Sequence, residues 1–81
     1  MKTINLALLY GEWADPADEG RFKAAVLAEA DDARTVNLTG PAPTFLYCWA
    51  TAWLKDAGVT RLWVTSPSNG AVLIWGRKDG G

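Results

Sequence analysis

The strongest constraint on the fold is a junction near the middle of the chain, where an apolar segment meets a Gly-Pro pair and an aromatic helix follows at once. The apolar segment is Thr35–Thr39, the turn begins at Gly40-Pro41, and the helix is expected from Pro43 or Thr44 to Ala57. The start of a helix carries unpaired backbone N–H groups and the positive end of its dipole, and both attract anions. Ligands of open α/β sheets bind at the carboxyl ends of the strands, so this junction predicts a phosphate-binding pocket.

The other apolar segments predict the order β-α-β-α-β-β. A nearly continuous apolar run over Thr3–Tyr10 is typical of a buried strand, and Asp15-Pro16 marks the start of a helix that runs to about Ala30. Two further strands are expected over Arg61–Thr65 and Ala71–Trp75, on either side of the turn Ser66–Gly70. Strands joined through a helix run parallel, and strands joined by a tight turn form an antiparallel hairpin. The predicted fold is one small Rossmann-like, ferredoxin-sized α/β domain over residues 1–81, with a mostly parallel sheet and an antiparallel C-terminal hairpin.

Size and helix pattern both predict self-association. A chain of 81 residues buries only about 60% of the surface of its unfolded state, so added burial against a second copy would help it. The central helix has an apolar arc wider than one sheet face needs, made of Phe45, Leu46, Tyr47, Trp49, Ala50, Trp53, Leu54 and Ala57. Cys48 lies in this helix and is expected to be a core or interface residue, because free cysteines are usually buried. We therefore expect a homodimer, and larger assemblies stay open.

Charge and residue counts exclude several classes of function. Lys and Arg together number 8 against 9 Asp and Glu, which argues against a protein that binds duplex nucleic acid through its phosphates. Without histidine and with a single cysteine, the chain offers no metal-ligand cluster, no catalytic triad and no histidine base, and no cofactor is expected. The single cysteine fits a reducing cytoplasm, and no apolar run has the ~20 residues of a membrane span. The start Met1-Lys2-Thr3 lacks the pattern of a signal peptide.

The residues expected at the pocket come from two loops at one edge of the sheet. The loop before the central helix and the loop between the last two strands follow parallel strands, so both should open on the same side. Short hydroxyl and amide side chains around free N–H groups suit phosphate oxygens. The expected ligand-binding residues of the two loops are Thr39, Gly40, Pro41, Thr44, Ser66, Ser68 and Asn69.

Two residues after the first strand are further candidates. Glu12 could act as a base or contact a ribose hydroxyl, and its alternative is a solvated loop residue. Trp13 could stack on a nucleobase, whereas the other four tryptophans lie in predicted helices and strands and are expected to pack in the core.

Two blocks of the sequence resemble one known family. The pattern of strand, hydroxyl residue, Gly, two residues, Pro and an aromatic-Leu-aromatic helix start occurs at Leu38–Cys48, and a turn into a Gly-Ala-Val-rich last strand occurs at Ser66–Ile74. Both resemble the small stand-alone CRISPR-associated ring nucleases of the third family, which bind and cleave cyclic tetra-adenylate, the messenger of type III CRISPR defence. The resemblance covers about Thr35–Trp75 and implies a homodimer that binds cyclic oligoadenylate.

The chain departs from that family at its catalytic positions. The family has an acid before the turn proline and an arginine after it, where this chain has Ser66 and Ser68, and the family's histidine is missing. Three functions follow as alternatives. The first is a metal-independent ring nuclease that uses the ribose 2′-hydroxyl as nucleophile, with Thr39, Thr44, Ser66 and Ser68 as candidate catalytic residues. The second is a protein that sequesters the messenger without cleaving it, and the third is a small protein-interaction domain without a nucleotide ligand.

Overall fold

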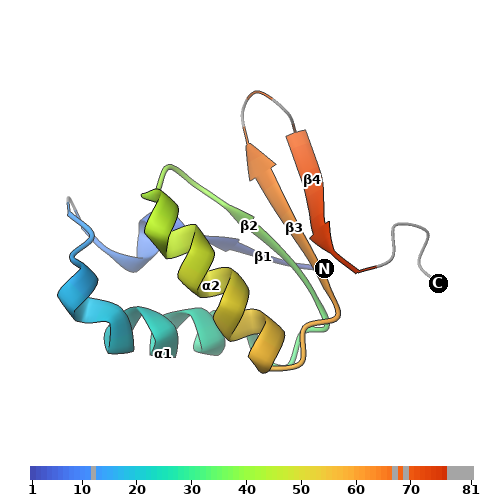
Figure 1. Cartoon of the computed structure of the whole chain (residues 1–81), viewed down its shortest axis with the longest axis horizontal. Helices are drawn as coiled ribbons and strands as arrows, with labels where there is room; N and C mark the ends of the chain where they lie inside the picture. The colour runs from blue at the N-terminus through green and yellow to red at the C-terminus, as the bar shows by residue number, and fades with distance from the viewer. Residues whose placement is uncertain (12, 67, 69, 77–81) are drawn as a thin grey trace.

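The sheet and helices follow the predicted order. The computed structural model describes residues 1–11, 13–66, 68 and 70–76. Its strands and α-helices are β1 (Lys2–Asn5), α1 (Glu19–Ala30), β2 (Thr35–Thr39), α2 (Thr44–Asp56), β3 (Arg61–Ser66) and β4 (Gly70–Trp75). The strand order is β1-β2-β3-β4, with β1, β2 and β3 parallel and β4 antiparallel to β3. The mostly parallel sheet with its C-terminal hairpin is therefore confirmed (Figure 1).

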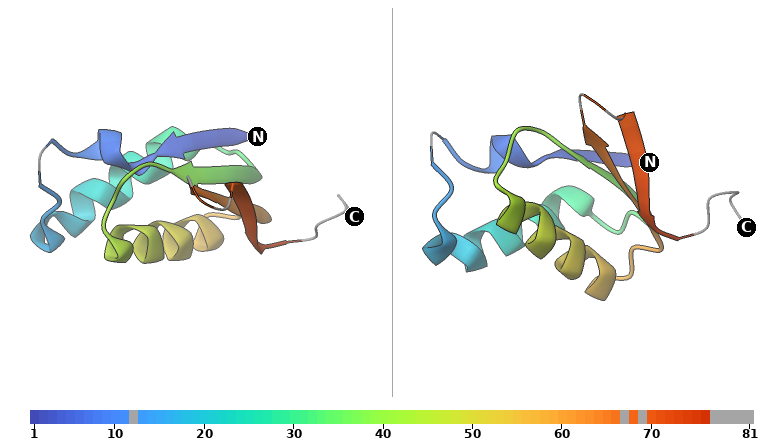
Figure 2. Two further views of the ribbon diagram at one scale, coloured as in Figure 1. Left: turned by 90° about the horizontal axis from the view of Figure 1, so that it is seen from above. Right: turned by 45° about the horizontal axis from the view of Figure 1, so that its top comes forward.

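Both helices pack against one face of the sheet, which makes the molecule two-layered (Figures 1 and 2). This arrangement is expected when successive right-handed crossovers move the chain along the sheet in one direction. Side chains from alternate positions of the strands form a single core with side chains of both helices. The fully buried large members of this core are Ile4, Leu6, Phe22, Val26, Val36, Leu38, Leu46, Leu54 and Leu62. At about 25 cal/mol per Å² of apolar surface, burial of these side chains is the main stabilising contribution.

The first strand is shorter than predicted. The sequence predicted a strand over Thr3–Tyr10, but β1 ends at Asn5 and Leu6–Leu9 forms a 3-10 helix. The Asn5 side chain accepts a hydrogen bond of 3.0 Å from the backbone N–H of Ala7, which turns the chain out of the extended conformation. Leu6 is fully buried, Leu9 packs partly buried against the core and Leu8 is 80% exposed, so an apolar run that is typical of a buried strand forms a helical turn with only part of its side chains inward.

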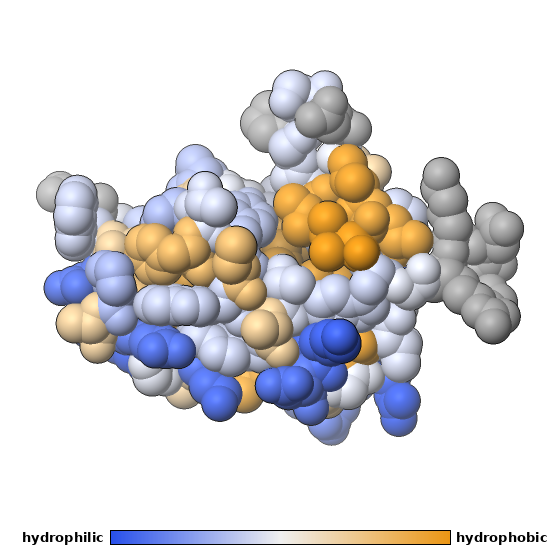
Figure 3. Space-filling model, viewed as in Figure 1, coloured by the Kyte–Doolittle hydropathy of each residue, from blue (hydrophilic) through white to orange (hydrophobic). Residues whose placement is uncertain are grey.

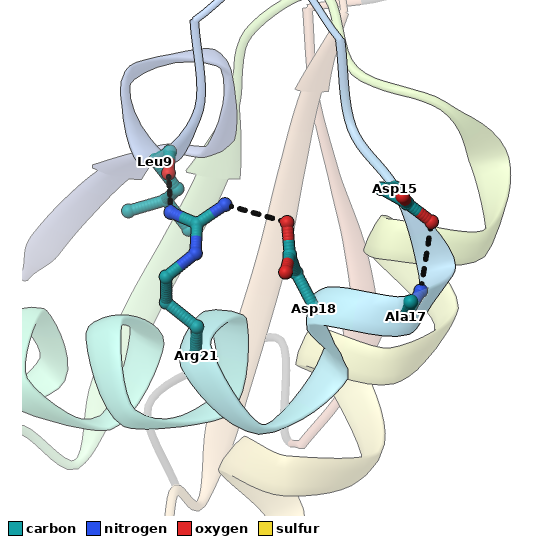
Figure 4. A network of polar contacts seen from close by, with 5 residues as sticks. All are labelled: Leu9, Asp15, Ala17, Asp18 and Arg21. Atoms are coloured by element: carbon teal, nitrogen blue, oxygen red, sulfur yellow. Dashed lines mark hydrogen bonds and ion pairs between the residues drawn. The ribbon is translucent and has the colours of Figure 1, made fainter.

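The predicted start of the first helix is confirmed in its capping residue. Asp15 Oδ1 accepts a hydrogen bond of 2.9 Å from the N–H of Ala17, and Pro16–Asp18 forms a 3-10 turn that leads into α1 (Figure 4). Arg21 then ties α1 to the preceding segment, because its guanidinium lies 3.0 Å from Asp18 Oδ2 and 3.3 Å from the carbonyl oxygen of Leu9 (Figure 4). Both side chains of the ion pair are about half exposed, so it contributes at most about 1 kcal/mol.

The second helix leaves part of its apolar arc at the surface. Trp53 is buried, whereas Phe45, Tyr47 and Trp49 are half-buried and form part of the surface beside the core. The Phe45 and Trp49 rings lie 5.0 Å apart and the Trp49 and Trp53 rings 5.8 Å apart, which gives a row of aromatic contacts along one side of α2.

Cys48 is exposed, so of the two predicted places for it the core is wrong, and an interface between copies stays a prediction. Its position on the polar stripe of the helix, with Thr51 and Lys55, outweighed the general tendency of cysteine to be buried.

Candidate functional site

A cavity of about 670 Å³ lies where the carboxyl ends of β2 and β3 meet the first turns of α2. Its volume is within the range of small-molecule sites in proteins. The cavity is lined by Thr39, Gly40, Pro41, Ala42, Tyr47, Val64, Thr65 and Ser66. The lining is mainly apolar and includes Pro41, Ala42, Val64 and the ring of Tyr47. Its polar side chains carry hydroxyl groups.

The Gly40-Pro41 turn forms the rim of the cavity, and the side chain of Asn5 packs against it. Gly40 has a φ of 103°, a conformation that favours glycine, and it packs against the side chain of Asn5 from the end of β1. A Cβ at residue 40 would lie 2.9 Å from Asn5 Cγ and would collide with Asn5 Oδ1. The asparagine that ends β1 and the glycine that starts the cavity rim therefore depend on each other.

Two tyrosine hydroxyls hold the same turn. Tyr47 Oη donates a hydrogen bond of 2.6 Å to the carbonyl oxygen of Gly40, and Tyr10 Oη donates one of 3.0 Å to that of Pro41. Burial, reinforced by the neighbouring Tyr10, raises the pKa of Tyr47 above its ordinary value of about 10. Tyr47 is therefore neutral near pH 7 and acts there as a hydrogen-bond donor to the turn.

The hydroxyls on the sheet side of the cavity already make hydrogen bonds within the protein. Thr65 Oγ1 donates to Asn37 Oδ1 over 2.7 Å, and Thr39 Oγ1 lies 3.5 Å from the carbonyl oxygen of Thr65. Asn37 is the polar residue that is buried within β2, and this bond satisfies its carbonyl oxygen. Both threonine hydroxyls thus use their protons inside the protein and keep lone pairs free to accept hydrogen bonds.

The start of α2 follows Ala42 of the cavity lining closely in the chain. The helix begins after Pro43, whose side chain cannot cap it, and no side-chain hydrogen bond caps the first turn. Thr44, the first residue of α2, is exposed. The positive end of the α2 dipole thus lies beside the cavity rim without a capping side chain.

The structure brings together some of the residues that the sequence predicted for the site. Four line the cavity: Thr39, Gly40, Pro41 and Ser66. Thr44 and Ser68 are exposed and do not line it, and Trp13 is 79% exposed and is not among its lining residues either. Glu12 and Asn69 lie outside the described residues.

Four lining residues were not predicted from the sequence: Ala42, Tyr47, Val64 and Thr65. Tyr47 carried a usable signal, because side chains in the first helical turn point back toward the N-terminus and so toward the Gly-Pro turn. Val64 is the register partner of Leu38 in the parallel ladder, and Thr65 follows it. Their place at the cavity follows from the strand order, which the sequence left open.

The charges at the site limit its chemistry. None of the described lining residues carries a formal charge, and Tyr47 is the titratable one among them. Over the same part of the chain, no three side chains of the metal-ligating types gather to hold an ion. The described lining residues therefore offer apolar contacts and hydrogen bonds, and none of them is a carboxylate or imidazole that could move a proton near pH 7.

Comparison of the chain with protein-family models, with curated protein sequences and with solved structures gave no match. Within the described residues, neither helix has the length and hydrophobicity needed to cross a membrane.

Proposed function

We propose that this protein binds a cyclic oligoadenylate, cyclic tetra-adenylate in the first place, and lowers the concentration of this messenger in type III CRISPR signalling. One observation carries the proposal. The two sequence blocks that resemble the third family of ring nucleases are separated by 17 residues in the chain, from Cys48 to Ser66, yet both contribute to one cavity. Gly40 and Tyr47 come from the first block and Ser66 from the second.

The composition of the site suits a nucleotide with its base and phosphate at different places. The apolar cavity, with the Tyr47 ring and the Val64 side chain as walls, accommodates a planar base. The uncapped start of α2 beside the rim supplies N–H donors and a positive dipole for a phosphate. The Thr39 and Thr65 hydroxyls, which use their protons inside the protein, can accept hydrogen bonds from ribose hydroxyls or from the amino group of adenine.

Cleavage would have to use the ligand's own nucleophile. The ribose 2′-oxygen attacks the adjacent phosphorus, the bond from phosphorus to the 5′-oxygen breaks, and a 2′,3′-cyclic phosphate and a 5′-hydroxyl form. The proton of the 2′-hydroxyl passes to water and the 5′-oxygen takes one from water. The lining residues that the structure describes contribute only positioning and stabilisation of charge to this step, because none of them is an acid or base that titrates near neutral pH. We therefore expect slow, metal-independent turnover.

The uncharged lining also supports a second candidate, a protein that sequesters the messenger without cleaving it. The two candidates share the binding step and differ in their products. Long incubation of the protein with cyclic tetra-adenylate separates them, since the nuclease yields linear adenylates with cyclic phosphate ends and the sequestering protein leaves the ring intact.

Calorimetric titration with cyclic tri-, tetra- and hexa-adenylate tests the binding step. Val64→Phe, which fills part of the cavity, should weaken binding of the tetra-adenylate ring by about tenfold or more, while Leu8→Phe, at an exposed site that does not line the cavity, should leave it unchanged. Absence of heat with all three rings, or equal binding by Val64→Phe and the unchanged protein, would contradict the proposal and favour an interaction domain without a nucleotide ligand.

A further inference from the structure

The β3–β4 hairpin presents an unpaired edge and an apolar surface side by side. In the described part of the chain, β4 is an outer strand of the sheet and pairs on one side only, with β3. The upper parts of the two strands stand clear of both helices (Figure 1). Figure 3 shows hydrophobic surface concentrated over this hairpin, where Val72 is 46% and Ile74 is 47% exposed.

Natural proteins protect such edges with lysine, proline, other charges or bulges, because an unpaired row of N–H and C=O groups can pair with another strand. The sequence of β4 is Gly-Ala-Val-Leu-Ile-Trp, which contains no charge and no proline. The ladder is irregular at the end of β4, where Trp63 pairs with Leu73 and Leu62 pairs with Trp75. The segment before this bulge is regular, so Gly70–Leu73 remains an open template for pairing.

Charge favours a second copy of this chain as the partner. In a two-fold symmetric interface the same surface of both copies is in contact, and a residue at the axis lies beside its own copy. A charged residue at the axis would therefore meet a like charge. Residues 62–75 contain no Asp, Glu, Lys or Arg, and Arg61, the charged first residue of β3, lies on the inner strand of the hairpin, between β2 and β4. The edge strand β4 carries no charge, so it can pair antiparallel with its own copy without repulsion, and it offers no charge to attract an oppositely charged protein.

We propose that two copies of the chain associate through antiparallel pairing of β4 with β4, which joins their sheets into one. This inference gives a surface to the homodimer expected from the sequence, and it rests on the proposed function in that one cyclic ligand is taken to occupy both copies. A two-fold axis perpendicular to the sheet keeps the helices of both copies on the same side. The Val72 and Ile74 side chains of the two copies then adjoin across the axis and shield each other from water.

The pairing also relates the two cavities. Val64, in the cavity wall, is the register partner of Val72 on β4, so the cavity lies one strand spacing, about 4.8 Å, from the paired edge. The dimer places both cavities on the same side of the joined sheet, facing a trough around the symmetry axis. A ring with repeated, identical nucleotides suits such a symmetric pair of sites.

Sedimentation velocity of the full chain, over a range of concentrations, measures the association. Val72→Lys places a charge at the proposed axis and should raise the dimer dissociation constant by about tenfold or more. Leu8→Lys introduces the same charge at another exposed apolar residue, 80% exposed and outside the hairpin, and should leave the constant unchanged. A monomer at every concentration, or equal effects of the two substitutions, would overturn the inference.

Hydrogen exchange of the unmodified protein provides a test that does not depend on folding of a variant. The amide protons of Gly70–Leu73 should exchange more slowly at high protein concentration than at low concentration, while those of β1, the opposite edge, should not change. Protection of β1 instead of β4 would overturn the inference. If the protein dimerises through β4 but gives no heat with any cyclic oligoadenylate, the proposed function is refuted and the β4 pairing stands. If a monomer binds the ring, the β4 pairing is refuted and the proposed function stands.

Discussion

At the scale of single residues, the cavity rim depends on one glycine whose replacement is costly for two reasons. Gly40 combines a positive φ of 103° with a close approach to Asn5, whereas Gly58, after α2, has a positive φ of 98° and open space around its missing Cβ. The two glycines therefore separate the cost of backbone strain from the cost of a collision.

We predict that Gly58→Ala lowers the free energy of unfolding by about 1–2 kcal/mol, the cost of a left-handed backbone for an L-residue. Gly40→Ala should lower it by about 2–5 kcal/mol, because displacement of the Asn5 side chain is added to the same strain. Urea unfolding of both variants measures the difference. Equal losses would mean that Asn5 moves aside freely and that the rim does not depend on it.

The Tyr47 hydroxyl gives the rim a dependence on pH. The pKa of Tyr47 is raised in the folded protein, so above about pH 10 the unfolded chain loses this proton before the folded one does. The folded state then binds more protons than the unfolded state, and stability falls as pH rises through this window. Below the unfolded pKa the contribution is fully present.

We predict that the free energy of unfolding decreases more steeply between pH 9 and pH 11 in the unchanged protein than in Tyr47→Phe. At pH 7 the same substitution should cost about 1 kcal/mol, since it removes the hydrogen bond to the Gly40 carbonyl. Denaturant titrations at several pH values provide the measurement. Parallel pH profiles for the two proteins would show that Tyr47 does not titrate differently in the folded state.

At the scale of elements, α2 links stability with the proposed ligand site. The helix starts at Thr44 after a proline and has no side-chain cap, which leaves the positive end of its dipole uncompensated. A negative charge placed there should stabilise the helix and at the same time repel a phosphate.

We predict that Thr44→Glu raises the free energy of unfolding by about 0.5 kcal/mol and weakens binding of cyclic tetra-adenylate by about tenfold. Thr44→Gln has a similar shape without the charge and is the matched control. Denaturant unfolding and calorimetric titration of both variants give the two quantities. An increase in stability without loss of affinity would remove the helix start from the binding site.

At the scale of the whole molecule, a two-layer fold leaves much of its sheet uncovered. Both helices lie on one face, and the β3–β4 hairpin extends beyond them with Val72 and Ile74 exposed (Figures 1 and 3). A partner that binds only the folded state stabilises it in proportion to the logarithm of its concentration, and in a homodimer the partner is the chain itself.

We therefore predict that the thermal midpoint rises with protein concentration over about a hundredfold range. Val72→Lys should remove most of this dependence and Leu8→Lys should keep it. Differential scanning calorimetry at several concentrations is the measurement. A midpoint independent of concentration in the unchanged protein would mean that folding of the chain is not coupled to its association.

The features of the fold that the sequence predicted correctly are those that depend on contacts between residues near one another in the chain. The bounds of β2 and the start of α2 were correct, because Gly40 and Pro43 act on the backbone locally. The start of the first helix was correct because the Asp15 cap is a contact between near neighbours. The predicted first strand was too long. Its apolar run is compatible with a strand or with a helical turn, and the hydrogen bond from the Ala7 N–H to the Asn5 side chain favours the turn. The core was the wrong place for Cys48, because its position on the polar side of α2 outweighs the general tendency of cysteine to be buried.

The sequence by itself determined the element order, the mixed sheet and the Gly-Pro junction at its carboxyl edge, since caps, turns and periodicity act over a few residues. Only the tertiary structure decided that Tyr47 and Val64 wall the cavity and that Thr65 shares its proton with Asn37. These contacts join residues of different elements, and they exist only once the order of the strands and the single helical face are fixed. The conformational preferences of single residues and turns do not depend on the order of the strands, so they cannot determine which side chains line the cavity.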